Sequence, residues 1–387
     1  MDTISRSQLL AARWHVQQVG REPGAREPDT RECDLLDYGI QDTGPDGAPW
    51  ALHIRGFDRS DDDLAVAWTI RGAPHYYRRA DLAEVSVAVS PLSSEDAGKR
   101  IFDASKKFRD AGTDPLEAMA ELAVEMRKIV TTATVKGEMS RQLTSVLPDH
   151  FLRYCKPCDA IHPYENSFRL AAIQAGLELQ PHTSPPVLQR IKGLRPNNFC
   201  RLGTEAAERF DVVRNHLRFY GAATPKQVAE FLDAPVRDVK AHWPSDVTDV
   251  SVDGQTRSAL TDDVSVLIDP PKPTGLRLVG PYDPLLQARD RELLIPDATL
   301  RQGDLARPRS PWRDLRGSRT DWHLAAGESR EETQHHRGAV VEDHRENHCR
   351  HRRAGSATGS VPGPRPRSRK NQVTLRRADA VASGTCR

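Results

Sequence analysis

Two cysteines and one histidine are the side chains of this sequence best suited to chemistry by type and spacing. Cys155 and Cys158 form a CxxC pair, and His162 follows four residues later. Thiolate sulphur and imidazole nitrogen are ligands that zinc prefers, and Cys200 or His182 offers a fourth. A structural reading also fits, in which two half-buried thiols end a helix and His162 caps its carbonyls. A single CxxC pair is a weak signal, so the structural reading is our default prediction and zinc is the alternative.

Residues 204–268 predict a unit of three helices followed by a β-hairpin. The first helix is marked by apolar residues three and four apart, namely Phe210, Val213, Leu217 and Tyr220. Gly221 follows at a position where a helix ends. Thr224 offers an N-cap hydroxyl, and Pro225 follows it at the first helical position. The sequence therefore predicts one amphipathic helix and then a short one.

The third predicted helix begins after Pro235 and ends before Pro244. It carries Arg237 and Lys240 on a face away from its apolar residues. Beyond it, Asp253-Gly254 favours a tight hairpin between two extended runs that end at Ile268. This is the winged-helix order, in which the third helix enters DNA, so Arg237 and Lys240 are predicted DNA contacts. A winged helix that serves protein contacts instead remains open.

Four segments follow from the pattern along the chain: 1–92, 93–203, 204–300 and 301–387. In the first, a helix capped by Ser5, the run Cys33–Ile40 and the strands Trp50–Ile54 and Ala65–Ile70 suggest a winged-helix-like unit. The second is mainly helical with a small sheet; its predicted elements are Glu95–Ala111, Asp114–Val130, Glu138–Cys158, Tyr164–Ala175 and the strand Leu177–Leu179. We therefore expect an α+β fold, mainly helical, with tandem winged-helix units.

Composition excludes several classes of protein. The 387 residues carry a formal net charge of only +2, so any nucleic-acid surface must be a local patch. No apolar run approaches the roughly 18 residues of a membrane span, and the N-terminus lacks the apolar core of a signal peptide. Six irregularly spaced cysteines predict reduced thiols. We therefore expect a cytoplasmic protein without membrane contact, monomeric by default. Neither a phosphate-binding glycine loop nor a serine elbow occurs, and we expect no cofactor.

Residues 301–387 differ from the rest of the chain. They are rich in arginine, contain Lys370 as their single lysine and show no sustained apolar period. One interpretation is a disordered basic tail that binds phosphates without sequence preference. The other is a lost reading frame near residue 300, because GC-rich genes translated out of frame give arginine-rich, lysine-poor sequence.

Three separated blocks of the chain together resemble the winged-helix DNA-binding family that includes the AlkZ-like DNA glycosylases. They are Gly280–Glu292, Trp68–His75 and Tyr154–His162. The resemblance runs from the first helix to the end of segment 204–300, and it implies tandem winged-helix units arranged around duplex DNA. It also implies a small β-rich portion after the first of these blocks, and that portion is not recognisable here.

The resemblance implies catalytic residues near the end of an early helix. Glycosylases of this family carry there a glutamine, an apolar residue and a glutamine or aspartate, which position water and stabilise positive charge on the sugar. If Gln41 takes the second position, Gly39 stands at the first and half of the motif is missing. Alternatively, the carboxylate of Asp42 activates water beside Gln41, which requires the helix to end near Gly39. The structural alternative is that Asp42 and Thr43 start the next turn.

The resemblance also places a basic and aromatic cluster near a DNA-facing cleft. Its members are Arg71, His75, Tyr76, Tyr77, Arg78 and Arg79. Arginines there are expected to contact phosphates, and a tyrosine to stack on a base or wedge between bases. A solvated charged face is the alternative, with one tyrosine pointing inward.

The function predicted from the sequence is a winged-helix protein that acts on duplex DNA without established catalysis. The first alternative is a monofunctional DNA glycosylase that excises alkylated or bulky-adduct bases, with Gln41 and Asp42 sharing the work. The second alternative is a protein-interaction scaffold. Salt-sensitive DNA affinity separates the first two from the scaffold, and base release separates the glycosylase from both.

Overall fold

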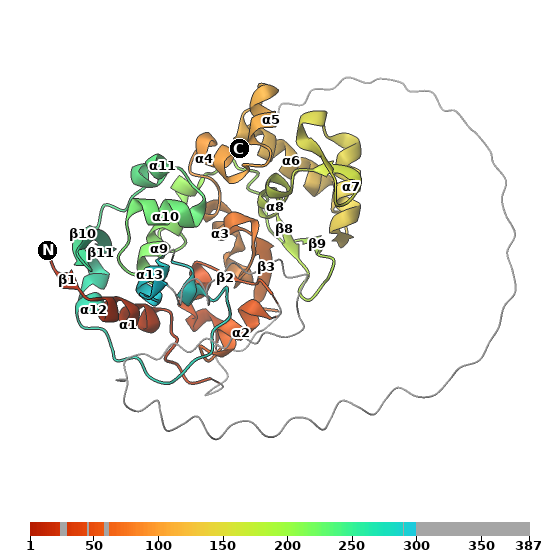
Figure 1. Cartoon of the computed structure of the whole chain (residues 1–387). Coiled ribbons are helices and arrows are strands. Elements are labelled where there is room, and N and C mark those ends of the chain that lie inside the picture. The colour runs from red at the N-terminus through yellow and green to blue at the C-terminus, as the bar shows by residue number, and fades with distance from the viewer. Residues whose placement is uncertain (24–28, 45, 58–61, 289, 299–387) are drawn as a thin grey trace, which may run out of the picture. The chain divides into compact units, whose positions relative to one another are not determined.

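The computed structural model describes residues 1–23, 29–44, 46–57, 62–288 and 290–298 (Figure 1). Helices and small sheets are mixed along these ranges, so the combination of α and β structure predicted from the sequence is confirmed. Within these ranges no helix is long and apolar enough to cross a membrane. The predictions for residues 301–387 lie outside the described residues.

The largest sheet joins strands from the first half of the chain. Its order is β2 (Ile40–Gln41), β4 (Pro74–Arg78), β3 (Leu64–Trp68), β8 (Leu177–Leu179), β9 (Val187–Arg190) and β5 (Thr134–Val135). Neighbouring strands are antiparallel. All five residues of β3 are buried, and helix α8 (Glu165–Gln174) packs against it. The sheet therefore holds Gln41 at its edge, beside β4.

The segment that leads to Gln41 differs from the prediction. The run Cys33–Ile40 forms only a short 3-10 turn, η2 (Asp34–Asp37), after a first turn η1 (Thr30–Glu32). Gly39 then adopts a φ of 94°, which favours glycine, and the chain enters β2. A Cβ at this position would lie 2.5 Å from the ring of Tyr77, so residue 39 has no room for a side chain. The predicted strand around Trp50 is instead helix α2 (Gly47–His53).

The predicted order of three helices and a hairpin is present in residues 204–268. The helices are α9 (Val212–Tyr220), α10 (Pro225–Leu232) and α11 (Val236–Ala241), and the hairpin strands are β10 (Val247–Val252) and β11 (Gln255–Leu260). Asp253 and Gly254 both have positive φ, as a two-residue hairpin turn of this kind requires. The second strand ends earlier than predicted, because residues after Leu260 form helix α12 (Val264–Ile268).

The N-terminal residues pack with this later unit. Strand β1 (Thr3–Ile4) pairs in parallel with β10. Helix α1 (Arg6–Val16) begins at Ser5, as predicted, and contacts α9, α12 and the short helix α13 (Arg291–Leu294). Ile4 and Leu9 share an apolar cluster with Val250 and Leu267. The predicted boundary at residue 92 therefore does not separate the first sixteen residues from residues 204–268.

The middle of the chain is mainly helical, as predicted, and differs from the prediction at one helix and at one hairpin. Its helices are α3 (Leu82–Ala88), α4 (Ser94–Arg100), α5 (Ser105–Asp110), α6 (Pro115–Ile129) and α7 (Lys136–Val146). The single helix predicted over 95–111 is thus divided into α4 and α5. Residues 152–158 were predicted as the end of a helix, but residues 152–163 form the hairpin of β6 (Leu152–Cys155) and β7 (Ala160–Pro163).

Candidate functional site

Gln41 borders a small cavity where several elements meet. The side chain is 8% exposed and lies on β2. The cavity has an open volume of about 10 Å³, which is enough for about one water molecule. Its lining is mainly aromatic and neutral: Tyr38, Gly39, Gln41, Ile70, His75, Tyr220, Phe231, Tyr282, Pro284 and Gln287. The cavity is therefore suited to hold a water against a carboxamide, and it is too small for a nucleobase.

Two neighbours orient the Gln41 carboxamide. Its Nε2 donates to Thr43 Oγ1 over 2.8 Å, and its Oε1 accepts from Arg71 Nη2 over 3.3 Å. Arg71 is itself held, because it donates to the carbonyl of Phe231 and lies 4.6 Å above that ring. Arg71 Nη2 also reaches Gln287 Oε1 at 3.3 Å. The predicted phosphate contact at Arg71 is thus a half-buried group that fixes the direction of Gln41.

The Asp42 side chain contacts the start of α2 and not the cavity. Its N–H continues the strand pairing by donating to the carbonyl of Pro74, and successive side chains of paired strands point to opposite faces. Its Oδ1 accepts from the N–H of Ala48 at the start of α2. The carboxylate does not line the cavity. The structure therefore brings Gln41 together with Thr43, two residues on, and does not bring it together with Asp42.

The histidine at the cavity is neutral at physiological pH. Burial lowers the pKa of His75 to about 3. Its Nδ1 lies 3.0 Å from the carbonyl of Ala73, and a carbonyl only accepts, so this nitrogen carries the proton. Burial also lowers the pKa of His216, which contacts Tyr38, to about 3. Neither imidazole supplies positive charge to the site.

Most of the predicted basic and aromatic cluster lies inside the sheet. His75, Tyr76 and Arg78 are at most 5% exposed. Arg78 forms an ion pair with Asp37 at 2.5 Å and donates to the carbonyl of Cys33, so it anchors the segment that precedes Gln41. Arg79 is half-buried and pairs with Glu178 at 2.7 Å. Because strand β4 is covered on both faces, a phosphate does not reach the three buried side chains in this conformation.

The predicted contacts on the third helix have a different environment. Arg237 and Lys240 lie on α11 and are exposed. Arg237 forms ion pairs with Glu95 at 3.3 Å and with its neighbour Asp238 at 3.2 Å. The Arg237–Glu95 pair is exposed on both sides, and such pairs contribute little to stability, so the guanidinium can exchange Glu95 for a phosphate at low cost.

Two buried ion pairs hold the Gly280 block against the N-terminal helices. Arg55, two residues after α2, makes a two-pronged contact with Asp283, at 2.7 and 2.8 Å. Arg13, on α1, does the same with Asp290, at 2.5 and 3.2 Å. The four side chains are at most 3% exposed. Sequence reasoning missed these partners, which are 228 and 277 residues apart along the chain and carry no local signal.

The Gly280 block forms one wall of the cavity beside Gln41. Asp283 also accepts from the N–H of Leu285 and so begins the turn η8 (Pro284–Leu286). Pro284, the first residue of that turn, and Gln287, the residue after it, line the cavity beside Gln41. Arg55 therefore positions one wall of the site through Asp283.

The Arg13–Asp290 pair predicts a specific response to acid. Burial opposes ionisation of Asp290, but the charge and hydrogen bonds of Arg13 outweigh it and lower the pKa of this carboxyl. A lowered folded-state pKa adds stability above the unfolded value of about 3.9, and this contribution is lost as pH falls through the folded value. We expect the free energy of unfolding, measured in urea, to fall more between pH 6 and pH 3 for the parent than for Asp290→Asn. Equal slopes would contradict this contribution.

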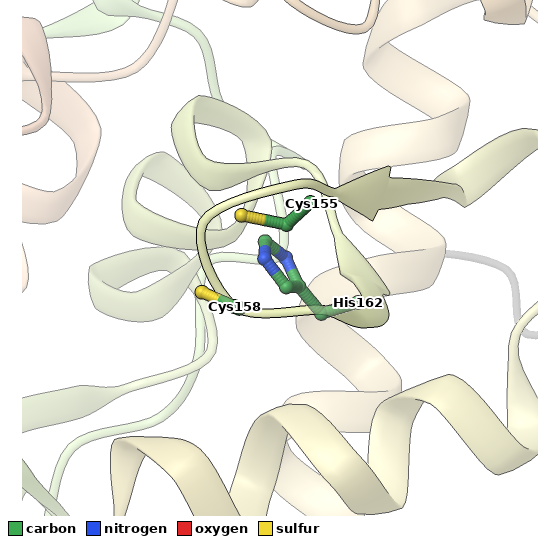
Figure 2. A group of neighbouring side chains, drawn as sticks. All are labelled: Cys155, Cys158 and His162. Atoms are coloured by element: carbon green, nitrogen blue, oxygen red, sulfur yellow. The ribbon is translucent and has the colours of Figure 1, made fainter.

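The candidate metal ligands come together on the β6–β7 hairpin (Figure 2). Cys155 ends β6, Cys158 lies in the turn and His162 lies on β7, with their ligand atoms within 4.8 Å of one another. The neighbouring side chains of His162 and Cys158 lower the pKa of Cys155 to about 7. The default prediction, a helix end capped by His162, is wrong, because residues 152–155 pair with residues 160–163 as a β-hairpin.

Comparison with known proteins gives one family and one solved structure of interest. The family model described as DNA glycosylase AlkZ-like matches residues 51–303. The structure of Streptomyces sahachiroi DNA glycosylase AlkZ aligns with a TM-score of 0.56 at 18% identity, over 78% of this chain and 82% of that chain, which shows a shared fold. No curated protein matches at comparable stringency. Since the family match spans well over half of the sequence, the chain belongs to the AlkZ-like DNA glycosylase family.

Proposed function

We propose that this protein is a monofunctional DNA glycosylase that hydrolyses the glycosidic bond of alkylated or bulky-adduct bases in duplex DNA. This was the first alternative from the sequence, and family membership supports it over a DNA-binding protein without catalysis. The family match begins after Gln41, so the role of that residue depends on geometry alone. The observation that carries the proposal is the Gln41 carboxamide, held by Thr43 and Arg71 at a cavity with room for one water.

The proposed reaction needs a positioned water and little else. Water oxygen bonds to C1′ of the sugar, the bond from C1′ to the base breaks, and the base leaves with the electron pair. A base alkylated at a ring nitrogen carries positive charge, so it departs as a neutral molecule without an acid to protonate it. The remaining proton passes to solvent. Gln41, which Thr43 and Arg71 hold in place, orients the water, and its amide dipole acts on the positive charge that develops on the sugar.

The neutral lining of the cavity fits this class of substrate. Among the described residues that line it, none is a carboxylate or a lysine. Without a lysine to attack the sugar, no covalent imine forms and the DNA strand stays uncut. The damaged base must be accommodated outside the cavity, since the cavity holds only a water-sized molecule. Damaged bases leave the duplex stack at lower cost, which favours them over normal bases.

The proposal is tested by incubating the full chain with a duplex that carries one N7-methylguanine. The expected products are the free base and an intact strand with an abasic site, in the stoichiometry of one base per site. A cut strand without added alkali would contradict the monofunctional reaction.

We further propose that the protein acts in the cytoplasm. Its residues 204–268 act there as a winged-helix unit, with α11 against the DNA backbone. The exposed side chains of Arg237 and Lys240 support this orientation. Replacing both with glutamine should weaken duplex affinity. It should also make the negative slope of log K against log salt shallower by about 1.8, since each phosphate contact contributes about 0.9. The matched control is Lys106→Gln with Lys107→Gln on α5, where both lysines are exposed. Equal slopes for the two double variants would exclude α11 as the DNA face and favour a scaffold.

A further inference from the structure

The β6–β7 hairpin holds the strongest chemical group outside the glycosylase site. Two sulphurs and an imidazole gather at one turn, and no role in base release involves them. Figure 2 shows the three side chains directed toward the same space, with the ring of His162 next to both sulphur atoms. We propose that Cys155, Cys158 and His162 bind a zinc ion, in a tetrahedral site whose fourth position is open to water.

The hairpin brings the ligands close to the required distances before a metal binds. The three ligand atoms lie within 4.8 Å of one another. In a tetrahedral site with Zn–S near 2.3 Å and Zn–N near 2.0 Å, neighbouring ligand atoms are about 3.5–3.8 Å apart. Side-chain rotations that move the ligand atoms by about an ångström therefore complete the site without moving the backbone.

The backbone of the turn is fixed by its own hydrogen bonds. The N–H of Cys158 donates to the carbonyl of Cys155 over 3.1 Å. Asp159 adopts a φ of 49°, and its Oδ1 accepts from the hydroxyl of Tyr154 over 2.6 Å. A preformed turn of this kind lowers the ordering entropy that metal binding must otherwise overcome.

The histidine is in the tautomer that a metal requires. Its Nδ1 lies 2.9 Å from the carbonyl of Pro163, which can only accept, so Nδ1 carries the proton and Nε2 keeps its lone pair. A histidine ligand that donates its other nitrogen to a carbonyl is the usual arrangement in metal sites, because it fixes the ring. His162 is thus oriented by Pro163 to present Nε2.

The type and number of ligands favour zinc over harder metals. Thiolate and imidazole select zinc among the common divalent ions of cells, whereas magnesium and calcium prefer oxygen ligands. Among the described residues, no other histidine, cysteine or carboxylate joins the group, and both fourth ligands predicted from the sequence, Cys200 and His182, lie outside it. Cys158 is exposed, so water has access to the fourth position. The metal would hold the hairpin closed, and this does not depend on the glycosylase proposal.

Cobalt provides the direct test, because it occupies zinc sites and absorbs light when bound to thiolate. The reduced, chelator-treated full chain is titrated with Co²⁺ and then with Zn²⁺. We expect one Co²⁺ per chain, with thiolate-to-cobalt charge-transfer bands and the strong visible bands of tetrahedral cobalt, all removed by one equivalent of Zn²⁺. Absence of these bands would overturn the proposal.

Variants identify the ligands. Cys155→Ser with Cys158→Ser should weaken binding by at least about 100-fold, and His162→Asn by more than about tenfold, because each loses direct metal ligands. His182→Asn is the matched control, since this exposed histidine has a positive φ that asparagine tolerates. Bands that persist in the double cysteine variant would overturn the assignment. A second measurement needs no variants: Zn²⁺ should protect Cys155 and Cys158 from an alkylating reagent, as read by peptide mass mapping. Alkylation that Zn²⁺ leaves unchanged would also overturn the assignment.

Discussion

Replacing Gln41 with alanine is expected to lower the rate of base release by about 100-fold or more, with affinity for intact duplex unchanged. The loss is large because a fixed polar group that faces developing charge contributes about 2.7–4 kcal/mol to the transition state. The Gln41 side chain is 8% exposed and binds Thr43 and Arg71, so alanine removes the fixed carboxamide that we propose orients the water. Single-turnover release of N7-methylguanine measures the rate, and fluorescence anisotropy measures the affinity.

Two further variants make this prediction specific. Thr43→Val removes the hydroxyl that accepts from Gln41 and should lower the rate by about tenfold, the effect of one hydrogen bond. Gln142→Ala is the matched control, since it removes an exposed glutamine on α7 and should leave the rate unchanged. If Gln41→Ala released base at the parental rate, Gln41 would not be the water-positioning residue.

Breaking the Arg55–Asp283 pair should have the largest effect on stability. The two side chains are 0% and 1% exposed. Arg55→Met leaves the carboxylate of Asp283 buried without its partner, which typically costs about 3–5 kcal/mol. We expect a loss of that size in the free energy of unfolding, measured by urea denaturation with circular dichroism. Adding Asp283→Asn should recover part of the loss, because no buried charge then remains unpaired.

An exposed ion pair provides the comparison. Lys106 and Asp110 on α5 form an i,i+4 pair with side chains 81% and 55% exposed. Lys106→Met should change the free energy of unfolding by less than about 1 kcal/mol, since solvent screens such pairs. An equally small loss for Arg55→Met would show that the Gly280 block is not held by this pair. The wall of the cavity at Pro284 and Gln287 would then need another support.

The parts of this fold that the sequence predicts well are those with local signals. Pro225 behind Thr224 begins α10 as expected, and Asp253-Gly254 forms the hairpin turn, because capping and turn chemistry act within a few residues. The hairpin at Cys155 was predicted as a helix, since short apolar runs do not distinguish the two periods. Local patterns thus predict the 204–268 unit better than residues 150–163.

The candidate site depends on contacts that local patterns do not contain. Gly39 suggests that a helix ends, but the pairing of β2 with β4, which separates the Asp42 side chain from Gln41, joins residues more than thirty positions apart. Arg13 and Arg55 meet their carboxylates more than two hundred residues later. The burial of Arg78 likewise follows from Asp37, which lies 41 residues before it. A charged cluster in the sequence therefore did not predict a charged surface.

The most direct test of the account is single-turnover base release by the full chain, with excess protein over a duplex that contains one N7-methylguanine. Free base is quantified by mass spectrometry, beside an undamaged duplex and the Gln41→Ala variant. We expect release from the damaged duplex only, with an uncut strand and a rate that falls by about 100-fold or more in the variant. No release by the parent, with salt-dependent duplex binding intact, would contradict catalysis and leave a DNA-binding member of the family.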